Sequence, residues 1–431
     1  MSTNNDLPSP QSSQAEFSPW AVFAHLDFFL LWSSGVATSI SALLRTLVSA
    51  QWLYETTGSA AQLGLLGAVQ LLQLPLALYG GSLADRVDRK KLMVLTQVAG
   101  SLMLLLLVIL AAGNALRPWH IFVVTGVSGM VNMLGGSARP AMLPRVIPRG
   151  LLTHAVTTLT VTSQLAMVIG PIVFWQVFDH LGVSNAFAVA AGFGLASVVM
   201  PLLIRASGKA DVTERQSTLR SLKDGTIFVM RHPLLPGLYI LDLGVTVVSF
   251  YRQLFPVFAK QLYGLGATGT GLLNTANAIG GIIGTFMVFY TGRFSRKGML
   301  VLVATLVYSV FLIAFGLNRS FVLGLAIVGV LGMTDSVSMT MRQAIVQLTT
   351  PDQMLGRATS FRSFAAMSAN NLGQVEVGML SAIIGAGQTM LIGGVLSVLF
   401  VLAVWRLLPS IRRYNFDVGE TVDPVGAGRA G

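Results

Sequence analysis

Twelve long apolar stretches, separated by short polar segments, dominate the pattern of hydrophobic and polar positions along this chain. Each stretch is long enough to cross the hydrocarbon core of a membrane as a helix, which takes about 20 mostly apolar residues. The pattern therefore predicts an all-α polytopic membrane protein with twelve transmembrane helices. The predicted spans lie near residues 24–53, 62–82, 92–112, 119–143, 151–179, 184–204, 235–262, 268–291, 299–317, 321–348, 353–383 and 388–408.

The overall composition agrees with a protein embedded in lipid. Hydrophobic residues make up 53% of the chain and charged residues 10%, whereas soluble proteins carry about 25% charged residues. The cations lie between apolar stretches, so the net charge of +11 does not indicate a nucleic-acid-binding protein. No phosphate-binding glycine-rich motif, metal-ligand spacing or nucleophilic arrangement is present. We therefore expect neither an enzyme nor a nucleotide-driven pump, and no metal or cofactor.

The placement of the basic residues predicts the orientation of the chain. The loops after the even-numbered spans and the C-terminal tail hold about 23 Lys and Arg residues, and the opposite loops hold about 3. The positive-inside rule then places both termini in the cytoplasm. We expect a multi-pass protein of the inner (plasma) membrane, with cytoplasmic tails at residues 1–20 and 410–431.

The two halves of the chain are related by an internal repeat. Arg45 matches Arg252 at an offset of 207 positions, and Arg139 matches Arg342 at an offset of 203. Further matches in the same order indicate a parallel repeat, as many transporters have. The repeat divides the chain into an N-terminal six-helix bundle, a cytoplasmic linker and a C-terminal six-helix bundle, at residues 21–205, 206–234 and 235–409.

A charged segment between the second and third spans carries the most specific motif. Residues 81–91 read GSLADRVDRKK, and the pattern Gly-x-Leu-Ala-Asp-Arg-x-x-Arg-Lys resembles the loop 2–3 motif of the major facilitator superfamily. The resemblance extends over residues 20–408 and implies two pseudo-symmetric six-helix bundles around a central cavity. Three further segments resemble the bacterial branch of enterobactin exporters and macrolide efflux proteins: TTGS at 56–59, RPA at 139–141 and QLTTPDQMLGR at 347–357.

The resemblance implies a conformational latch in this charged segment. In the family the Asp of the motif, here Asp85, lies near the cytoplasmic start of span 11 and pairs with basic residues at the end of span 4. We expect Thr350 to cap the helix of span 11, whose positive end attracts a carboxylate by about 0.3–1 kcal/mol. The alternative is that the loop only sets the topology. The latch residues are Gly81, Asp85, Arg86, Arg89, Lys90 and Arg139.

Four carboxylates in or beside the spans are candidates for proton coupling, because ionisable groups in a membrane are costly and usually functional. For Asp335, which lies opposite Asn132 in the repeat, the alternative is a fixed ion pair with Arg342. Span 4 lacks the buried Arg that many proton/drug antiporters carry. The candidates are Asp242, Asp335, Glu376 and Asp27, of which Asp27 has an interfacial alternative.

Arg45 and Arg252 are the main candidates for substrate binding. The resemblance places spans 1 and 7 opposite each other across the central cavity, where two cations would favour an anionic ligand. The alternative is that both side chains extend toward the outer headgroups. Trp32 and Tyr251 are aromatic candidates for the same pocket, with ordinary packing as the alternative.

Gly170-Pro171 in span 5 resembles a helix-kinking element that is common in exporters. Proline removes a backbone donor and bends the helix, while glycine permits close packing. The alternative is an ordinary proline kink.

Together these features predict a secondary exporter that moves an amphipathic small molecule by alternating access, with protons as counter-ion. The resemblance implies a siderophore or a drug as cargo. A lysophospholipid or nutrient transporter of the same fold is the alternative, and a non-transporting receptor or scaffold has less support. We expect a monomer in the bilayer with no nucleic-acid or nucleotide partner.

Overall fold

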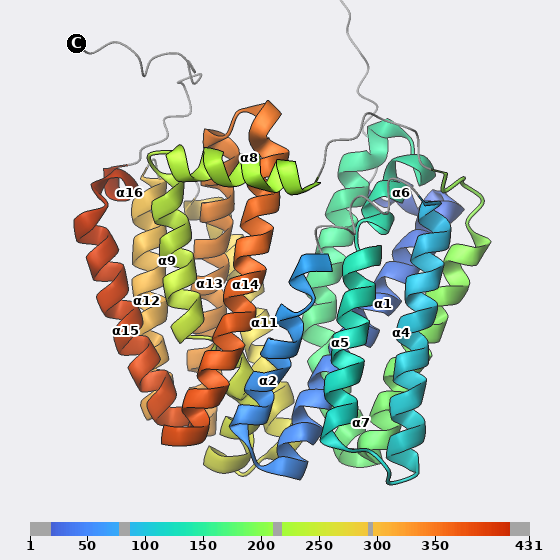
Figure 1. The fold of residues 1–431 in the computed structure, drawn as a ribbon, viewed down its shortest axis with the longest axis horizontal. Coiled ribbons are helices and arrows are strands. Elements are labelled where there is room, and N and C mark those ends of the chain that lie inside the picture. The colour runs from blue at the N-terminus through green and yellow to red at the C-terminus, as the bar shows by residue number, and fades with distance from the viewer. Residues whose placement is uncertain (1–18, 77–86, 210–217, 292–295, 414–431) are drawn as a thin grey trace, which may run out of the picture.

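The computed structural model describes residues 19–76, 87–209, 218–291 and 296–413. These residues form two helical bundles that stand side by side, with helix α8 (Thr218–Arg231) lying across one end (Figure 1). The charged segment at Gly81, Asp85 and Arg86 lies outside the described residues, as does its copy at residues 292–295.

The N-terminal bundle is built from the first half of the chain. Helix α7 crosses the bundle twice, because Gly182 takes a positive φ of 81° that turns the chain back on itself. The elements are η1 (Pro19–Ala24), α1 (Leu26–Thr57), α2 (Ala60–Leu71), α4 (Arg89–Ala112), α5 (Pro118–Gly135), α6 (Ala138–Val146), η2 (Arg149–Leu151) and α7 (Leu152–Leu203).

The C-terminal bundle has the same number of crossings. Its first span is broken after Val248 and continues as short 3-10, α and π segments. The elements are α9 (Leu235–Val248), η3 (Tyr251–Leu254), α10 (Phe255–Val257), η4 (Phe258–Leu262), α11 (Gly266–Thr291), α12 (Lys297–Leu317), α13 (Phe321–Thr349), α14 (Asp352–Ile384), α15 (Ala386–Leu407) and α16 (Pro409–Arg413).

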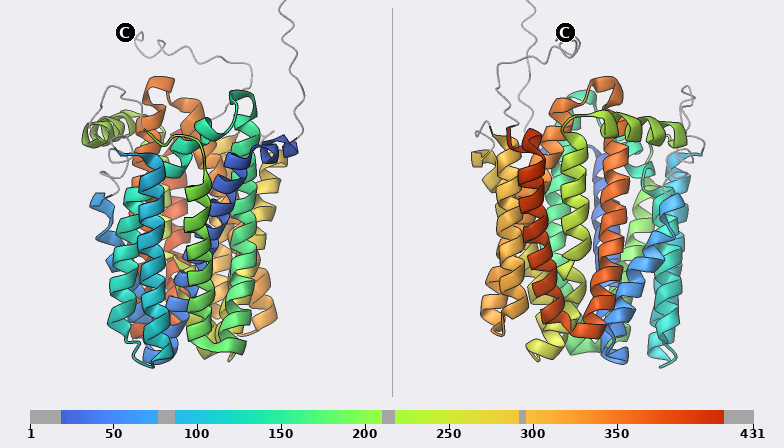
Figure 2. Two further views of the ribbon diagram at one scale, coloured as in Figure 1. Left: turned by 90° about the vertical axis from the view of Figure 1, so that its right-hand side faces the viewer. Right: turned by 60° about the vertical axis from the view of Figure 1, so that its left-hand side comes forward.

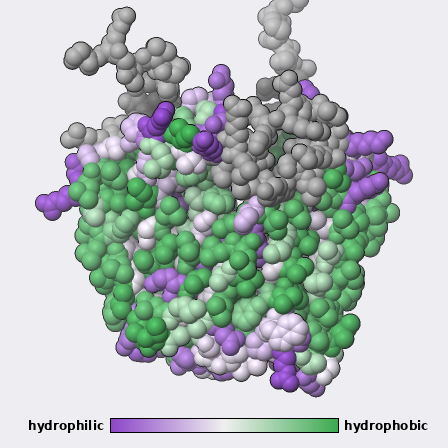
Figure 3. Space-filling model, in the orientation of Figure 1, coloured by the Kyte–Doolittle hydropathy of each residue, from purple (hydrophilic) through white to green (hydrophobic). Residues whose placement is uncertain are grey.

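The helices confirm the predicted all-α fold with twelve crossings. Among the described residues, 9 helical segments are long and apolar enough to span a membrane, and α7 among them crosses twice. The short apolar helix α2 and the more polar helix α14 complete the set. Large apolar side chains such as Ile109 (69% exposed) and Val322 (76% exposed) face outward. Figure 3 shows a mainly apolar surface on the flank that faces the viewer, with most of the hydrophilic residues toward the two ends.

The start of α14 differs from the prediction. The helix begins at Asp352 with Pro351 as its N-cap residue, and the hydroxyl of Thr350 is buried without a hydrogen-bond partner. The predicted Thr350 cap is therefore wrong. The extended backbone of Pro351 moves the helix start one residue beyond the expected position, out of reach of the Thr350 side chain.

The two bundles pack closely together at the end opposite α8, which we call the far side. There α2 crosses α14, and the backbones of Gly64 and Gly378 approach so closely that a Cβ on Gly64 would lie 3.1 Å from the Cα of Gly378. Thr270 donates a hydrogen bond to Gln51 at 2.7 Å across the same junction. Figure 2 shows both bundles from two further sides. The structure therefore represents a conformation that is closed on the far side.

Candidate functional site

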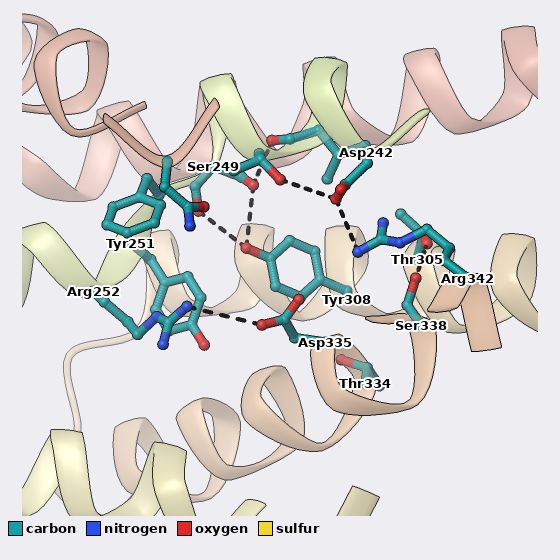
Figure 4. Close-up of a pocket in the computed structure, with 14 residues that line it drawn as sticks. Asp242, Ser249, Tyr251, Arg252, Thr305, Tyr308, Thr334, Asp335, Ser338 and Arg342 are labelled. Carbon is teal, nitrogen blue, oxygen red and sulfur yellow. Dashed lines mark hydrogen bonds and ion pairs between the residues drawn. The ribbon is translucent and has the colours of Figure 1, made fainter. Parts of the chain in front are cut away.

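A polar pocket inside the C-terminal bundle is lined by four charged residues that lie within spans, Asp242, Arg252, Asp335 and Arg342 (Figure 4). Helices α9, α12, α13 and α14 surround it, together with the break after α9. The residues that line it include Asp242, Thr246, Ser249, Tyr251, Arg252, Thr305, Tyr308, Thr334, Asp335, Ser338, Arg342 and Asn370.

Two arginine–aspartate pairs cross this pocket. Arg342 Nη2 lies 2.8 Å from Asp242 Oδ1, and both side chains are mostly buried. Arg252 Nη2 lies 3.9 Å from Asp335 Oδ2, and these side chains are 45% and 44% exposed. The first pair is a charge-assisted hydrogen bond, whereas the second is a looser ion pair. The predicted partner of Asp335 was Arg342, so that alternative is wrong.

The break in the first span of this bundle positions Arg252. Because the helix is interrupted, the carbonyl oxygen of Ser249 is available to accept a hydrogen bond from the Tyr308 hydroxyl at 3.0 Å. The Ser249 hydroxyl lies 3.1 Å from the same Tyr308 oxygen. The hydroxyl of Tyr251 accepts from Asn277 on α11. These bonds hold the segment so that the guanidinium of Arg252 reaches α13.

A second polar pocket, in the N-terminal bundle, holds the repeat-matched arginines. Arg139 Nη2 donates to Thr38 at 2.9 Å. When the side-chain amide of Gln97 is oriented with its oxygen toward Arg139, that oxygen accepts a hydrogen bond from the same nitrogen at 3.1 Å. Arg45 lines the pocket from α1. The residues that line it include Thr38, Ser41, Arg45, Thr96, Gln97, Ser101, Ser128, Asn132, Arg139 and Ser197.

A larger and mainly apolar pocket lies on the other side of Arg139, between α1, α6 and α7. Its volume is about 350 Å³. Trp32 lines it and donates a hydrogen bond from its indole nitrogen to Thr162 at 3.0 Å. The remaining lining residues include Val36, Leu143, Leu159 and Ala166. Arg139 thus separates a polar compartment from an apolar one, an arrangement suited to an amphipathic ligand.

The structure places the predicted substrate residues in separate pockets. Arg45 lies in the N-terminal polar pocket and Arg252 in the C-terminal one, so the two do not converge on one cavity in this conformation. Arg252 is held by Asp335 and lies over the Phe250 ring at 5.6 Å. Tyr251 is 3% exposed and packs in the C-terminal bundle.

The described latch residues all bond within the N-terminal bundle. Arg89 Nη1 donates to the Ala141 carbonyl at 3.2 Å, and Lys90 Nζ donates to the Ile204 carbonyl at 2.7 Å. Arg139 lines the N-terminal polar pocket. Their expected contact with Asp85 falls outside the described residues and stays a prediction.

The other two carboxylate candidates have different surroundings. Asp27 accepts hydrogen bonds from the backbone nitrogens of Arg205 (3.0 Å) and Ala206 (2.9 Å), so both of its oxygens hold the segment that follows α7. Glu376 lies on α14 near the far side, and its Oε2 is buried without a hydrogen-bond partner. We therefore regard Asp27 as structural, in line with its interfacial alternative.

Gly170 and Pro171 lie where α7 packs against its neighbours. A Cβ on Gly170 would lie 2.4 Å from a methyl carbon of Leu43 on α1. The carbonyl of Pro171 and the ring of Trp175 pack against Gly271 on α11. The element therefore contributes to the contact between the bundles, and its role in export stays a prediction.

Sequence reasoning missed the uncharged members of the two polar pockets. Gln97 is 8% exposed within α4, and Tyr308 is 9% exposed within α12. Both are polar residues inside apolar spans, which is the signal that could have identified them. Reasoning from charged residues alone passed over them.

Comparison with known proteins gives the family. A sequence model described as the Major Facilitator Superfamily matches residues 28–373. The enterobactin exporter EntS of Escherichia coli (strain SE11) is 28% identical over 338 residues, which are 76% of this chain and 80% of the relative. EntS of Escherichia fergusonii gives the same values.

Solved transporter structures share the fold. A POT family transporter in complex with 5-aminolevulinic acid has a TM-score of 0.71 at 12% identity, covering 89% of this chain and 96% of its own. A bacterial homologue of the human lysosomal transporter Spinster, inward-facing and unoccupied, has a TM-score of 0.68 at 16% identity, covering 90% and 98%. The chain therefore belongs to the major facilitator superfamily, and it is a membrane transporter rather than an enzyme.

Proposed function

We propose that this protein is a proton-coupled exporter that moves an amphipathic small molecule, a siderophore or a drug, out of the cell by alternating access. The observation that carries the proposal is the pair of arginine–aspartate contacts in the C-terminal pocket. Charged groups inside a membrane are expensive and are retained where they carry ions or substrates. The sequence similarity to enterobactin exporters supports the direction of transport and the siderophore class.

Asp335 is the proposed proton carrier. Its ion pair with Arg252 is 3.9 Å long and both side chains are about half-exposed, so a proton can reach the carboxylate and release the arginine. The Asp242–Arg342 pair is 2.8 Å long, mostly buried and supported by Thr246 at 3.4 Å. We assign this tighter pair to holding α9 against α13.

We also propose which end of the molecule faces each side of the membrane. The positive-inside distribution puts α8 and both termini in the cytoplasm. The conformation described, closed on the far side, is then the inward-facing state that receives cargo from the cytoplasm. We propose that Asp85 stabilises the opposite state through the start of α14, with a strength of about 0.3–1 kcal/mol at an exposed helix end.

Proton-gradient-driven transport in vesicles tests the proposal. Inverted membrane vesicles energised to an acidic interior should accumulate an amphipathic cargo such as a catechol siderophore or a fluorescent drug. Asp335→Asn should reduce gradient-driven uptake at least 10-fold while leaving cargo exchange without a gradient largely intact. Asp85→Asn should reduce uptake less, several-fold, because it shifts the equilibrium between states without removing the proton carrier.

Two results would contradict the proposal. Uptake by Asp335→Asn that keeps the wild-type dependence on the pH gradient would remove Asp335 as the carrier. Accumulation that survives collapse of the gradient by a protonophore would remove proton coupling altogether. Glu376→Gln serves as the comparison carboxylate, because Glu376 lies outside the C-terminal polar pocket.

A further inference from the structure

The polar pockets of the two bundles are built on the same repeat positions but carry different charges. Arg45 occupies the position of Arg252, and Arg139 occupies the position of Arg342. All four arginines line their respective pockets. The repeat has therefore kept both cations in each bundle.

Among the described residues, carboxylates pair with the matched arginines of the C-terminal bundle only. Asp335 is matched by Asn132 at the offset of 203, and Asp242 is matched by Gly35 at the offset of 207. Asn132 lines the N-terminal pocket, and a Cβ on Gly35 would lie 3.6 Å from the guanidinium of Arg139. Within the described part of the chain, no carboxylate lies within ion-pair distance of Arg45 or Arg139.

The N-terminal pocket also contains donors that have no acceptor. Arg139 Nε and the hydroxyl of Ser128 are buried without a hydrogen-bond partner, and Ser128 is 3% exposed. The partners that Arg139 does have, Thr38 and Gln97, are neutral. Two cations inside a membrane span without a counter-charge are costly unless something else supplies one.

We propose that Arg45 and Arg139 bind an anionic group of the cargo, a carboxylate, phenolate or phosphate, in the N-terminal bundle. The apolar part of the same molecule then lies in the apolar pocket between α1, α6 and α7 that Trp32 lines. Arg139 lines both this pocket and the polar one. The C-terminal pairs are already neutral, so Asp335 remains free for coupling. The inference rests on the proposed function only in taking the anion to be part of the cargo.

A carboxylate introduced at Gly35 tests the inference without removing either arginine. Gly35→Asp recreates the C-terminal arrangement, because the new side chain reaches the guanidinium of Arg139. Gly35→Asn adds the same bulk without the charge. The probe is 2-naphthoate, an aromatic carboxylate, and its neutral counterpart is 2-naphthamide.

Binding to the purified full-length protein in nanodiscs gives the readout. Gly35→Asp should bind 2-naphthoate at least 10-fold more weakly than Gly35→Asn does, while the two variants bind 2-naphthamide within 2-fold of each other. Arg45→Gln and Arg139→Gln should each weaken 2-naphthoate about 10-fold, the effect of one charge-assisted hydrogen bond. Arg406→Gln, an exposed arginine at the end of α15, is the matched control.

Three results would overturn the inference. The first is equal 2-naphthoate affinity in Gly35→Asp and Gly35→Asn. The second is a loss of 2-naphthoate affinity in Arg252→Gln as large as that in Arg45→Gln, which would indicate a binding site shared by both bundles. The third is inorganic phosphate binding as tightly as 2-naphthoate, which would make this an inorganic-anion site and not a cargo site. None of these measurements needs a proton gradient, so this inference and the exporter proposal can fail separately.

Discussion

At the scale of single residues, the two ion pairs of the C-terminal pocket differ in burial and length, and this difference predicts their contributions to stability. Removing Arg342 leaves the mostly buried Asp242 without its 2.8 Å partner, whereas removing Arg252 leaves the half-exposed Asp335 accessible to water. We expect Arg342→Gln to cost about 1–3 kcal/mol and Arg252→Gln less than about 1 kcal/mol.

Thermal unfolding of the purified protein measures this difference. The apparent melting temperature should fall clearly in Arg342→Gln and little in Arg252→Gln. The double variant Asp242→Asn/Arg342→Gln should recover part of the loss, because no unpaired charge remains. Equal melting temperatures for the two single variants would contradict the distinction between a structural pair and a coupling pair.

His232, in the turn between α8 and α9, predicts a pH dependence outside the spans. Its Nδ1 accepts hydrogen bonds from the backbone nitrogens of Leu234 (3.1 Å) and Leu235 (3.3 Å), and burial lowers the pKa of its imidazole below the usual value. The unfolded chain therefore takes up this proton first as the pH falls. The stability from this residue is present above about pH 6.5 and is lost as the pH falls below it.

A comparison with His232→Asn isolates this contribution from other titrating groups. The Asn oxygen can accept the same backbone hydrogen bonds but does not titrate. The apparent melting temperature should fall further between pH 7.5 and pH 5.5 in the wild-type protein than in the variant. The same loss in both would show that His232 does not contribute to the pH dependence.

At the scale of elements, the crossing of α2 and α14 determines how closely the two bundles can approach each other on the far side. A Cβ on Gly67 would lie 2.6 Å from the Gln374 Cβ and 2.7 Å from the Asn371 carbonyl oxygen. Glycine at this position permits an approach that no other residue allows. Gly67→Val should therefore open the far side and shift the protein away from the conformation described here.

Cysteine labelling can follow this shift directly. The chain contains no cysteine, so an introduced cysteine is the only thiol that reacts. A single Ala366→Cys on α14 should react with a membrane-impermeant maleimide from the α8 side in the wild-type background, and at least 5-fold more slowly with Gly67→Val. Gly100→Ala is the control, since a Cβ on Gly100 meets nothing within 4 Å. An unchanged labelling rate in Gly67→Val would contradict this role of the crossing.

At the scale of the whole molecule, the distribution of charge predicts the orientation in the membrane. The sequence assigns about 23 basic residues to the loops and tail of one side and about 3 to the loops of the other, which under the positive-inside rule strongly favours cytoplasmic termini. Reporter fusions at residues 210 and 420 should both report a cytoplasmic location. A periplasmic signal from either position would reverse the assignment of the inward-facing state.

The sequence by itself determined the number of spans, the relation between the halves and the family. These properties depend on local features, namely the length of apolar runs, the placement of charges between them and a motif of neighbouring residues. For the same reason the matched arginines of the two halves can be identified from their positions along the chain alone.

Only the tertiary structure decided which charges meet. Asp335 and Arg342 are seven residues apart on α13, about 10.5 Å along the axis at 1.5 Å per residue, too far for an ion pair. Each therefore finds its partner on the segment from Asp242 to Arg252. Likewise, Arg139 meets Thr38 of α1 in the N-terminal pocket, although the two residues are 101 positions apart in the sequence. Such choices depend on how helices distant in sequence pack against one another, and no pattern along the chain encodes that directly.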